Sequence, residues 1–240
     1  MRRFGSDVGD LDVDFTSRPP LLVTDLLRRC GSLTEDAAWN LPVGARTEAL
    51  VALATLSDSR PLIIALRCPH TACGEALEIE IEPGELRSVC QDRERDVVNV
   101  RLGNNWLELR RPTGRDQRNW LGTHWPDIET ARARMLASLL SAPPGDSLDP
   151  PAIAALEDEL AIIDPLVAFN LAVICPACGE TAEHPGDLGR HALATLRQIH
   201  DRMFESVARL ATHFHWTEPE ILALPLWRRE RYLALAESIQ

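Results

Sequence analysis

The sequence predicts a mainly helical α+β fold that carries a zinc-ribbon-like β element. Two short cysteine loops, here called the cysteine knuckles, each follow an apolar run; the first contains Cys68 and Cys73, the second Cys175 and Cys178. A β-hairpin is expected over residues 97–109, and most of the remaining apolar residues recur at helical spacing. These observations predict a ribbon built from two knuckles and a hairpin within a helical chain.

Length and charge limit the classes of protein that fit. The chain has 240 residues, is 45% hydrophobic and carries a net charge of −11. Such a charge disfavours broad attraction to nucleic acid or to an anionic membrane. No apolar run reaches the roughly 18 residues of a membrane span, and the N-terminus lacks the apolar core of a signal peptide. We therefore expect a cytoplasmic protein without membrane contact, whose cysteines are metal ligands or buried thiols rather than disulfides.

The expected organisation is a flexible arm followed by one domain. Residues 1–40 mix Gly, Asp, Ser and Pro with short apolar stretches, which predicts an extended arm with little core of its own. Residues 41–240 are expected to form a single zinc-stapled α+β domain. Within it a helix is predicted over residues 46–56, and strands at 62–66 and 76–82 lead into and out of the first knuckle.

A helical segment over residues 113–163 is expected between the knuckles. Thr113 and Asp116 are placed to cap its first helix, and further helices are predicted over 127–140 and 153–163. Between these two helices, residues 141–147 contain Pro-Pro-Gly and are typical of a linker. The knuckles on either side of this segment are expected to hold the two halves of the chain together.

The C-terminal part, residues 188–240, is expected to be helical. A strand over 166–174 leads into the second knuckle, and from Leu188 to Phe214 apolar residues form one stripe of a long helix, which is either core packing or a helical docking surface. Thr217 and Glu220 form a capping box for the next helix. The last helix carries three arginines, interpreted either as a solvated face or as contacts to an acidic partner: Arg228, Arg229 and Arg231.

The spacing of the knuckle cysteines predicts one structural zinc site. Zn²⁺ prefers four thiolates in a tetrahedron, and a C-x₂₋₄-C loop can place two sulfurs on the same ion. The predicted ligands are Cys68, Cys73, Cys175 and Cys178. Four thiolates leave no open position, so the metal would stabilise the fold rather than catalyse. The alternative is four buried free cysteines.

Other residues of metal-binding type have less defined roles. His70 and His184 flank the knuckles and could replace a ligand or donate hydrogen bonds to one, whereas Cys30 and Cys90 lie outside any paired spacing and are expected to pack as small apolar side chains. The sequence contains no Gly-rich phosphate loop, H-E-x-x-H or G-x-S-x-G motif. His213 and His215 are expected to pack or cap at a helix end, and we predict no enzyme.

Several motifs in order along the chain resemble the T4-type phage baseplate hub proteins, also described as hub assembly chaperones, of contractile phage tails and related injection systems. The resemblance covers most of residues 41–235. It implies a non-enzymatic protein that helps to build a baseplate, with baseplate or tail proteins as partners. The motifs are Leu41-Pro42-Val43-Gly44-Ala45-Arg46, Arg67-Cys68-Pro69 through Gly74-Glu75, Leu109-Arg110-Arg111-Pro112-Thr113-Gly114-Arg115-Asp116, Cys175-Pro176-Ala177-Cys178-Gly179, His213-Phe214-His215-Trp216-Thr217-Glu218-Pro219-Glu220-Ile221-Leu222-Ala223-Leu224-Pro225, and Arg228-Arg229-Glu230-Arg231-Tyr232-Leu233.

The ribbon alone would also suit a regulatory or nucleic-acid-binding adaptor. Ribbons that bind nucleic acid usually present a basic face with exposed aromatics, and the acidic balance of this chain counts against that role. The first knuckle, from Cys68 to Cys73, is longer than the tight C-x-x-C form, which leaves the metal geometry to be tested.

Overall fold

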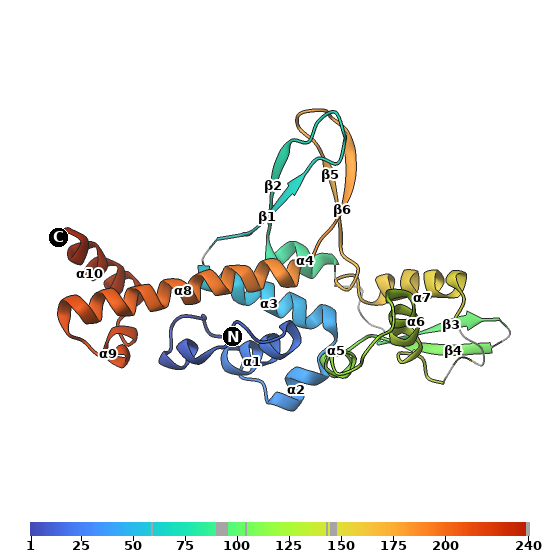
Figure 1. Cartoon of the computed structure of the whole chain (residues 1–240), viewed down its shortest axis with the longest axis horizontal. Helices are drawn as coiled ribbons and strands as arrows, with labels where there is room; N and C mark the ends of the chain where they lie inside the picture. The colour runs from blue at the N-terminus through green and yellow to red at the C-terminus, as the bar shows by residue number, and fades with distance from the viewer. Residues whose placement is uncertain (59, 90–95, 104, 143, 145–147, 239–240) are drawn as a thin grey trace.

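The computed structural model describes residues 1–240 except 59, 90–95, 104, 143, 145–147 and 239–240. It is elongated along one long helix, α8 (Leu188–Phe214), with α9 (Glu218–Leu222) and α10 (Leu226–Ser238) at one end and a mixed lobe at the other (Figure 1). Two β-hairpins project together from the middle. Among the described helices, none combines the length and apolar composition that a membrane span requires.

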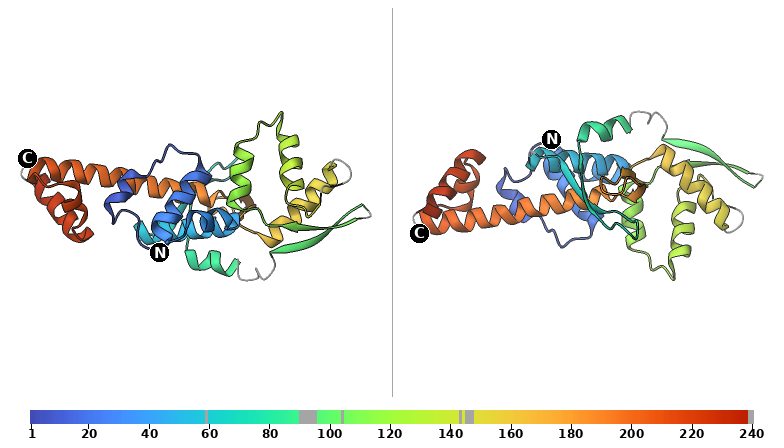
Figure 2. Two further views of the ribbon diagram at one scale, coloured as in Figure 1. Left: turned by 90° about the horizontal axis from the view of Figure 1, so that it is seen from below. Right: turned by 90° about the horizontal axis from the view of Figure 1, so that it is seen from above.

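Residues 1–40 are folded, and the extended arm expected there is wrong. They form a short 3₁₀ helix (Val8–Asp12), which contacts α8, and two helices that contact each other, α1 (Pro19–Gly31) and α2 (Glu35–Asn40) (Figure 2). Proline at the first position of α1 starts that helix, because it needs no backbone N–H there. The side chains of Leu26, Leu27 and Cys30 along α1 are almost fully buried, so this region supplies core instead of lacking it.

The body of the molecule is the largest hydrophobic cluster. It forms where α1, α3 (Val43–Asp58) and the first half of α8 pack against each other. The helix predicted at 46–56 is part of α3. Residues 62–66 and 76–82 form the predicted strands. The buried members of this body cluster are Phe4, Val13, Leu22, Leu26, Cys30, Leu50, Val51, Leu53, Ala54, Leu62, Ile64, Ile81, Leu86, Leu166, Leu188, Ala192, Leu196 and Ile199.

Both knuckles sit at the turns of antiparallel hairpins. The first hairpin pairs β1 (Leu62–Arg67) with β2 (Ala76–Ile81), and the second pairs β5 (Asn170–Ile174) with β6 (Thr181–Pro185). Each is a separate two-stranded sheet. Strand β6 and the helix α4 (Pro83–Val89) that follows β2 were not predicted from the sequence.

The segment between the knuckles forms a lobe with its own core. The predicted hairpin is present as β3 (Val97–Leu102) and β4 (Asn105–Arg110), followed by α5 (Gly114–Leu121), α6 (Ile128–Ala137) and α7 (Pro150–Ile163). Most of the predicted linker at 141–147 lies outside the described residues. The buried residues of the lobe are Val100, Leu109, Leu136, Leu139, Leu140, Ile153, Leu156, Leu160 and Ile163.

The long helix α8 has the predicted bounds, and most of its apolar stripe is core. Residues from Leu188 to Ile199 pack in the body, whereas Met203, Val207 and Leu210 pack against α9. The predicted capping box forms, since the backbone N–H of Thr217 donates to Glu220 at 2.8 Å. Most of this stripe is therefore covered by the chain itself rather than left as a docking surface.

Candidate metal centre

The four predicted cysteines meet where the two hairpin tips come together (Figure 1). Their sulfur atoms all lie within 4.8 Å of one another. The Sγ atoms of Cys68 and Cys178 are 3.7 Å apart, and those of Cys73 and Cys175 are 3.8 Å apart. A tetrahedral ion with metal–sulfur bonds of about 2.3 Å requires sulfur–sulfur distances of about 3.8 Å. The cluster therefore has the dimensions of a four-thiolate metal site.

Backbone hydrogen bonds close each knuckle in the same way. The N–H of Cys68 donates to Glu75 O and that of Cys175 donates to Glu180 O, both at 2.9 Å. Gly74 and Gly179 adopt φ values of 64° and 76°, a left-handed conformation that favours glycine. The turns thus place two sulfurs on the same side of each tip.

The longer first knuckle fits the cluster because its extra residues form a turn. The N–H groups of Cys73 and Gly74 donate to His70 O at 2.9 and 3.2 Å. This turn brings Cys73 back toward the sulfur of Cys68. The departure from the C-x-x-C spacing therefore does not prevent all four sulfurs from meeting.

The thiols perturb one another's ionisation. A backbone hydrogen bond from His70 lowers the pKa of Cys68, but burial and the neighbouring thiols outweigh it and raise that pKa to about 12. A backbone hydrogen bond from Cys178 lowers the pKa of Cys175 to about 7, with a further contribution from Ala177 and against the effect of desolvation. Burial and the neighbouring thiols thus disfavour the thiolate forms of Cys68 and Cys73. A bound cation would favour these thiolates, because it displaces their protons and balances the negative charge that forms.

Little besides the cysteines holds the two hairpin tips together. The buried residues at the tips are Cys68, Leu77 and Cys175, with Leu66 and Val173 partly buried against them. Two-stranded hairpins are marginal in water unless they pack against something larger. A metal ion in the cluster would therefore supply most of the stabilisation at this point, and with four thiolate ligands it would have no open position for substrate.

The two histidines near the knuckles lie outside the cluster. Among the described residues, only the four cysteines group within ligand distance there. His70 is exposed and contributes backbone atoms to the knuckle turn. His184 lies on β6 opposite Leu171, and its Nε2 is buried with no hydrogen-bond partner.

The remaining candidate residues have mixed outcomes. Cys30 is buried in the body as expected, whereas Cys90 lies outside the described residues. His215 ends α8 in a left-handed conformation, φ 59°, and His213 is exposed on the last turn. Each accordingly sits at a helix end, as the sequence predicts.

The arginines of the last helix do not share one environment. Arg228 and Arg231 are exposed, but Arg229 is only 4% exposed, so a fully solvated arginine face is wrong for this residue. It is covered by the N-terminal segment, and its Nη2 donates to Gly5 O at 3.5 Å. Because residues 1–40 were expected to form a flexible, extended arm, this cover was not predicted.

Two of the motifs that carry the family resemblance pair with each other. The N–H of Val43 donates to Pro112 O at 2.8 Å and the N–H of Gly114 donates to Leu41 O at 3.1 Å. This pairing joins the body to the lobe. A side chain on Gly114 would lie 2.5 Å from a guanidinium nitrogen of Arg46, so the joint requires glycine there.

Two buried charged residues at this joint were missed by the sequence analysis. Arg46 is 2% exposed, and its guanidinium donates to Ala38 O, Pro20 O and Thr24 Oγ1 at 2.5, 2.8 and 2.9 Å. Burial lowers the pKa of Arg46 to about 10. The fully buried Asp164 accepts the N–H of Gly44 at 3.1 Å. Arg46 lies on the same helical face as Leu50 and Leu53, which was the available signal.

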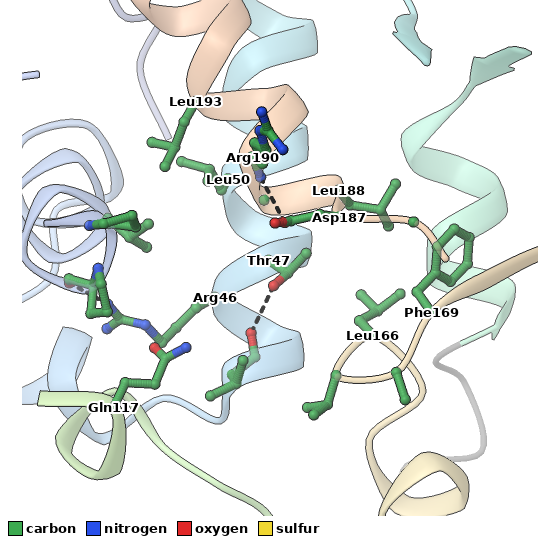
Figure 3. Close-up of a pocket in the computed structure, with 18 of the residues that line it drawn as sticks. Arg46, Thr47, Leu50, Gln117, Leu166, Phe169, Asp187, Leu188, Arg190 and Leu193 are labelled. Carbon is green, nitrogen blue, oxygen red and sulfur yellow. Dashed lines mark hydrogen bonds between the residues drawn. The ribbon is translucent and has the colours of Figure 1, made fainter. Parts of the chain in front are cut away.

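A pocket of 880 Å³ lies beside this joint, between α1, α3 and the start of α8 (Figure 3). Two of its polar side chains already make hydrogen bonds: Asp187 accepts the N–H of Arg190 at 2.9 Å, and Thr47 Oγ1 donates to Val43 O at 3.0 Å. Among the described residues that line it there is no cysteine, serine or histidine, and Asp187 is the single carboxylate.

Comparison with known proteins yields no match: no protein-family model, curated protein or solved structure matches this chain. No relative therefore indicates a function for this chain.

Proposed function

We propose that this protein is a non-enzymatic structural or assembly protein, chaperone-like in action, for the baseplate of a contractile phage tail or contractile injection system. Its partners are baseplate or tail proteins, and it acts in the cytoplasm where such particles are assembled. A structural Zn²⁺ ion, held by the two knuckles, stabilises its fold.

The observation that carries the proposal is the closed four-sulfur cluster between distant parts of the chain. Cys68 and Cys178 are 110 residues apart in the sequence, and their sulfurs are 3.7 Å apart. A metal with four thiolate ligands has no free position for substrate, which suits a structural role. The lobe lies between the two knuckles in the sequence, so the metal would close a large loop and fix how this lobe sits on the body.

The motifs support the same role, because their residues make structural contacts. The motif at 41–46 pairs with the motif at 109–116, and the motif at 213–225 forms the turn from α8 into α9. In that turn, the ring of Trp216 stacks on Phe214 and contacts Tyr232 edge-on. Motifs whose residues form contacts between secondary-structure elements are expected of a protein with a structural rather than a catalytic role.

Zinc is the metal that the site favours, with iron as the competitor for four thiolates. Visible absorption distinguishes iron from zinc, because a ferric four-thiolate site absorbs visible light and a zinc site does not. Metal analysis of the purified protein tests the assignment. About one zinc per chain is the expected result, and iron in its place would overturn the zinc assignment.

The nucleic-acid adaptor remains the alternative, and the surface of the first hairpin counts against it. Glu78 and Glu80 on β2 are exposed, as is Glu82 just after it. These carboxylates would repel a phosphate backbone. A ribbon that binds nucleic acid would instead present basic and aromatic side chains there.

Affinity purification from the native host tests the proposed function. The tagged full-length chain, washed at low and at high salt, is expected to retain baseplate or tail subunits, identified by mass spectrometry. A Cys175→Ser variant is expected to lose metal and to retain less of these subunits, whereas Cys30→Ala, which changes a cysteine outside the cluster, keeps both. Recovery of nucleic acid or polymerase subunits in place of tail proteins would contradict the proposal.

A further inference from the structure

A second hollow, here called the arginine groove, is lined by residues 3–6, by the end of α3 and by residues of α8 and α10. Its volume is 670 Å³. The charged residues that line it are five arginines and four carboxylates, whereas its remaining walls are largely apolar. The charged residues are Arg3, Arg60, Arg202, Arg209, Arg229, Asp58, Glu205, Glu230 and Glu237.

Ion pairs within the chain already hold three of these arginines. Asp58 accepts from Arg60 and from Arg202, each at 2.7 Å. Arg209 pairs with Glu237 at 2.5 Å. In the part of the chain that the structure describes, no such ion pair within 4 Å holds Arg229, although Glu230 is close enough to interact with its charge.

Arg229 is also the buried member of the set. It is 4% exposed, and its Nε is buried without a hydrogen-bond partner. Its Nη2 donates to Gly5 O at 3.5 Å, which is long for a hydrogen bond. Desolvation lowers the pKa of Arg229, because burial disfavours its charge. Buried guanidinium groups are normally paired, so the Nε of Arg229, which has no partner among the described residues, indicates an absent acceptor.

The geometry of a guanidinium limits what this acceptor is. The Nε and Nη2 edge of arginine presents two parallel N–H groups that match the two oxygens of a carboxylate. Five arginines against four carboxylates leave the groove one net positive charge, which is little attraction for a polyanion such as nucleic acid. The site therefore suits one carboxylate rather than a run of phosphates.

The rest of the groove suits a peptide. Phe4, Ile199, Met203 and Leu233 supply apolar wall, and Leu226 at the start of α10 is 44% exposed. An arginine beside an apolar hollow is typical of the sites that dominate protein interfaces.

We propose that the arginine groove docks a protein partner through an acidic side chain flanked by apolar residues, with Arg229 binding its carboxylate through Nε and Nη2. The assignment concerns a site far from the cysteine cluster. The proposed docking site does not depend on a role in a baseplate. It assigns the partner contact to the buried Arg229 alone, rather than to Arg228, Arg229 and Arg231 together.

Nuclear magnetic resonance of the arginine Nε–Hε groups in the full chain tests this site. The probes are acetyl-Leu-Glu-Leu-amide, its Gln analogue and inorganic phosphate, and the Arg229 signal is assigned by its loss in Arg229→Gln. The Glu peptide is expected to shift the Arg229 signal saturably, and the Gln peptide to bind at least tenfold more weakly. Equal shifts with both peptides, or no saturable shift with either, would overturn the proposal. A shift with phosphate but not with the Glu peptide would also overturn it, because the site would then take a free anion.

Two variants on the same helix separate binding from folding. Arg229→Gln is expected to reduce binding of the Glu peptide at least tenfold, whereas Arg231→Gln, which changes an exposed arginine, leaves it within twofold. Equal losses in both variants would mean general electrostatic attraction and would contradict the proposal. If Arg229→Gln does not fold, the comparison of the Glu and Gln peptides on the unaltered protein decides the question.

Discussion

The cysteine tip and the helical body hold together by different means. The body buries 18 apolar side chains in one cluster, whereas the tip buries three residues, two of which are cysteines of the cluster. Long helices with wide apolar faces can exclude water from a core, but two thin hairpins cannot. A bound metal would therefore stabilise the protein most at the hairpin tips, where the chain buries the fewest apolar side chains.

The body and the hairpin tips should therefore unfold separately. The body cluster is formed mainly by α1, α3 and α8, with Leu62, Ile64 and Ile81 from the base of the first hairpin, and it contains none of the four clustered cysteines. The tip, in contrast, would depend on deprotonated thiols and a cation. Local opening of the hairpins without global unfolding is the expected behaviour when the metal is removed.

The largest predicted effect is the loss of hairpin protection when the metal site is broken. In Cys175→Ser, amide exchange in β1, β2, β5 and β6 should rise about a hundredfold, or about 3 kcal/mol of local stability, while α3 stays protected. Hydrogen exchange with mass spectrometry measures both regions at once. The control Cys30→Ala should instead weaken the body and keep the metal. Unchanged exchange in the hairpins of Cys175→Ser would contradict the separation.

The next effect is on the body at its joint with the lobe. A Cβ on Gly44 would lie 1.8 Å from Oδ1 of the buried Asp164, so Gly44→Ala should cost roughly 3 kcal/mol in the free energy of unfolding. Urea denaturation measures this loss. At Gly84 no atom lies within 4 Å of an added Cβ, and Gly84→Ala should be neutral or slightly stabilising. Equal effects of the two substitutions would show that Gly44 is not closely packed.

A smaller loss is expected at the capping box of α5, where Arg110 donates to Asp116 at 2.7 Å. Burial raises the pKa of Asp116, but hydrogen bonds from Arg110 and Thr113 outweigh it and hold this pKa below its ordinary value. Asp116→Asn should cost about 1–2 kcal/mol at pH 7, since solvent partly screens the pair.

The lowered pKa of Asp116 also sets the direction in which the effect of Asp116→Asn changes with pH. A carboxyl whose pKa is lower in the folded protein stabilises it above the unfolded pKa of about 3.9 and loses that contribution as the pH falls further. The difference between the unaltered protein and Asp116→Asn should therefore shrink below about pH 4. A difference that stays constant from pH 7 to pH 3 would show that the charge of Asp116 is not its source.

The smallest effect is expected at the capping box of α9. Glu220 accepts the N–H of Thr217 at 2.8 Å, as Asp116 does for Thr113, but it is exposed and has no arginine partner among the described residues. Glu220→Gln should lower the thermal midpoint by less than about 2 °C. Thermal unfolding of both variants, followed by circular dichroism, compares the capping boxes of α5 and α9. If Glu220→Gln lowers the thermal midpoint as much as Asp116→Asn does, burial does not determine how much a capping box stabilises the protein.

Much of the local structure could be predicted, because its causes lie within a few residues. The apolar spacing of α8 gave its bounds, and the capping residues Thr113 and Thr217 gave the starts of α5 and α9. The cluster was predictable since C-x₂₋₄-C spacing limits where sulfurs can point. The helix α1 was missed because composition outweighed a real signal: Pro19 at its start, then Leu22, Leu26 and Cys30 on one face.

Burial of charged groups could not be predicted, because it depends on which distant segments meet. Arg229 is covered by Gly5, and Asp164 meets Gly44, at separations of 224 and 120 residues. No local pattern distinguishes Arg229 from Arg228 or Arg231. Such residues become visible only once the whole fold is known.

Zinc X-ray absorption of the purified full-length protein would show whether a metal joins the two hairpin tips. About one zinc per chain with four sulfur ligands at about 2.3 Å is the expected result. The spectrum of Cys178→Ser should show at most three sulfurs. Nitrogen or oxygen ligands in the unaltered protein, or protein without bound metal and with the hairpins still protected from exchange, would contradict the claim that a metal joins the two tips.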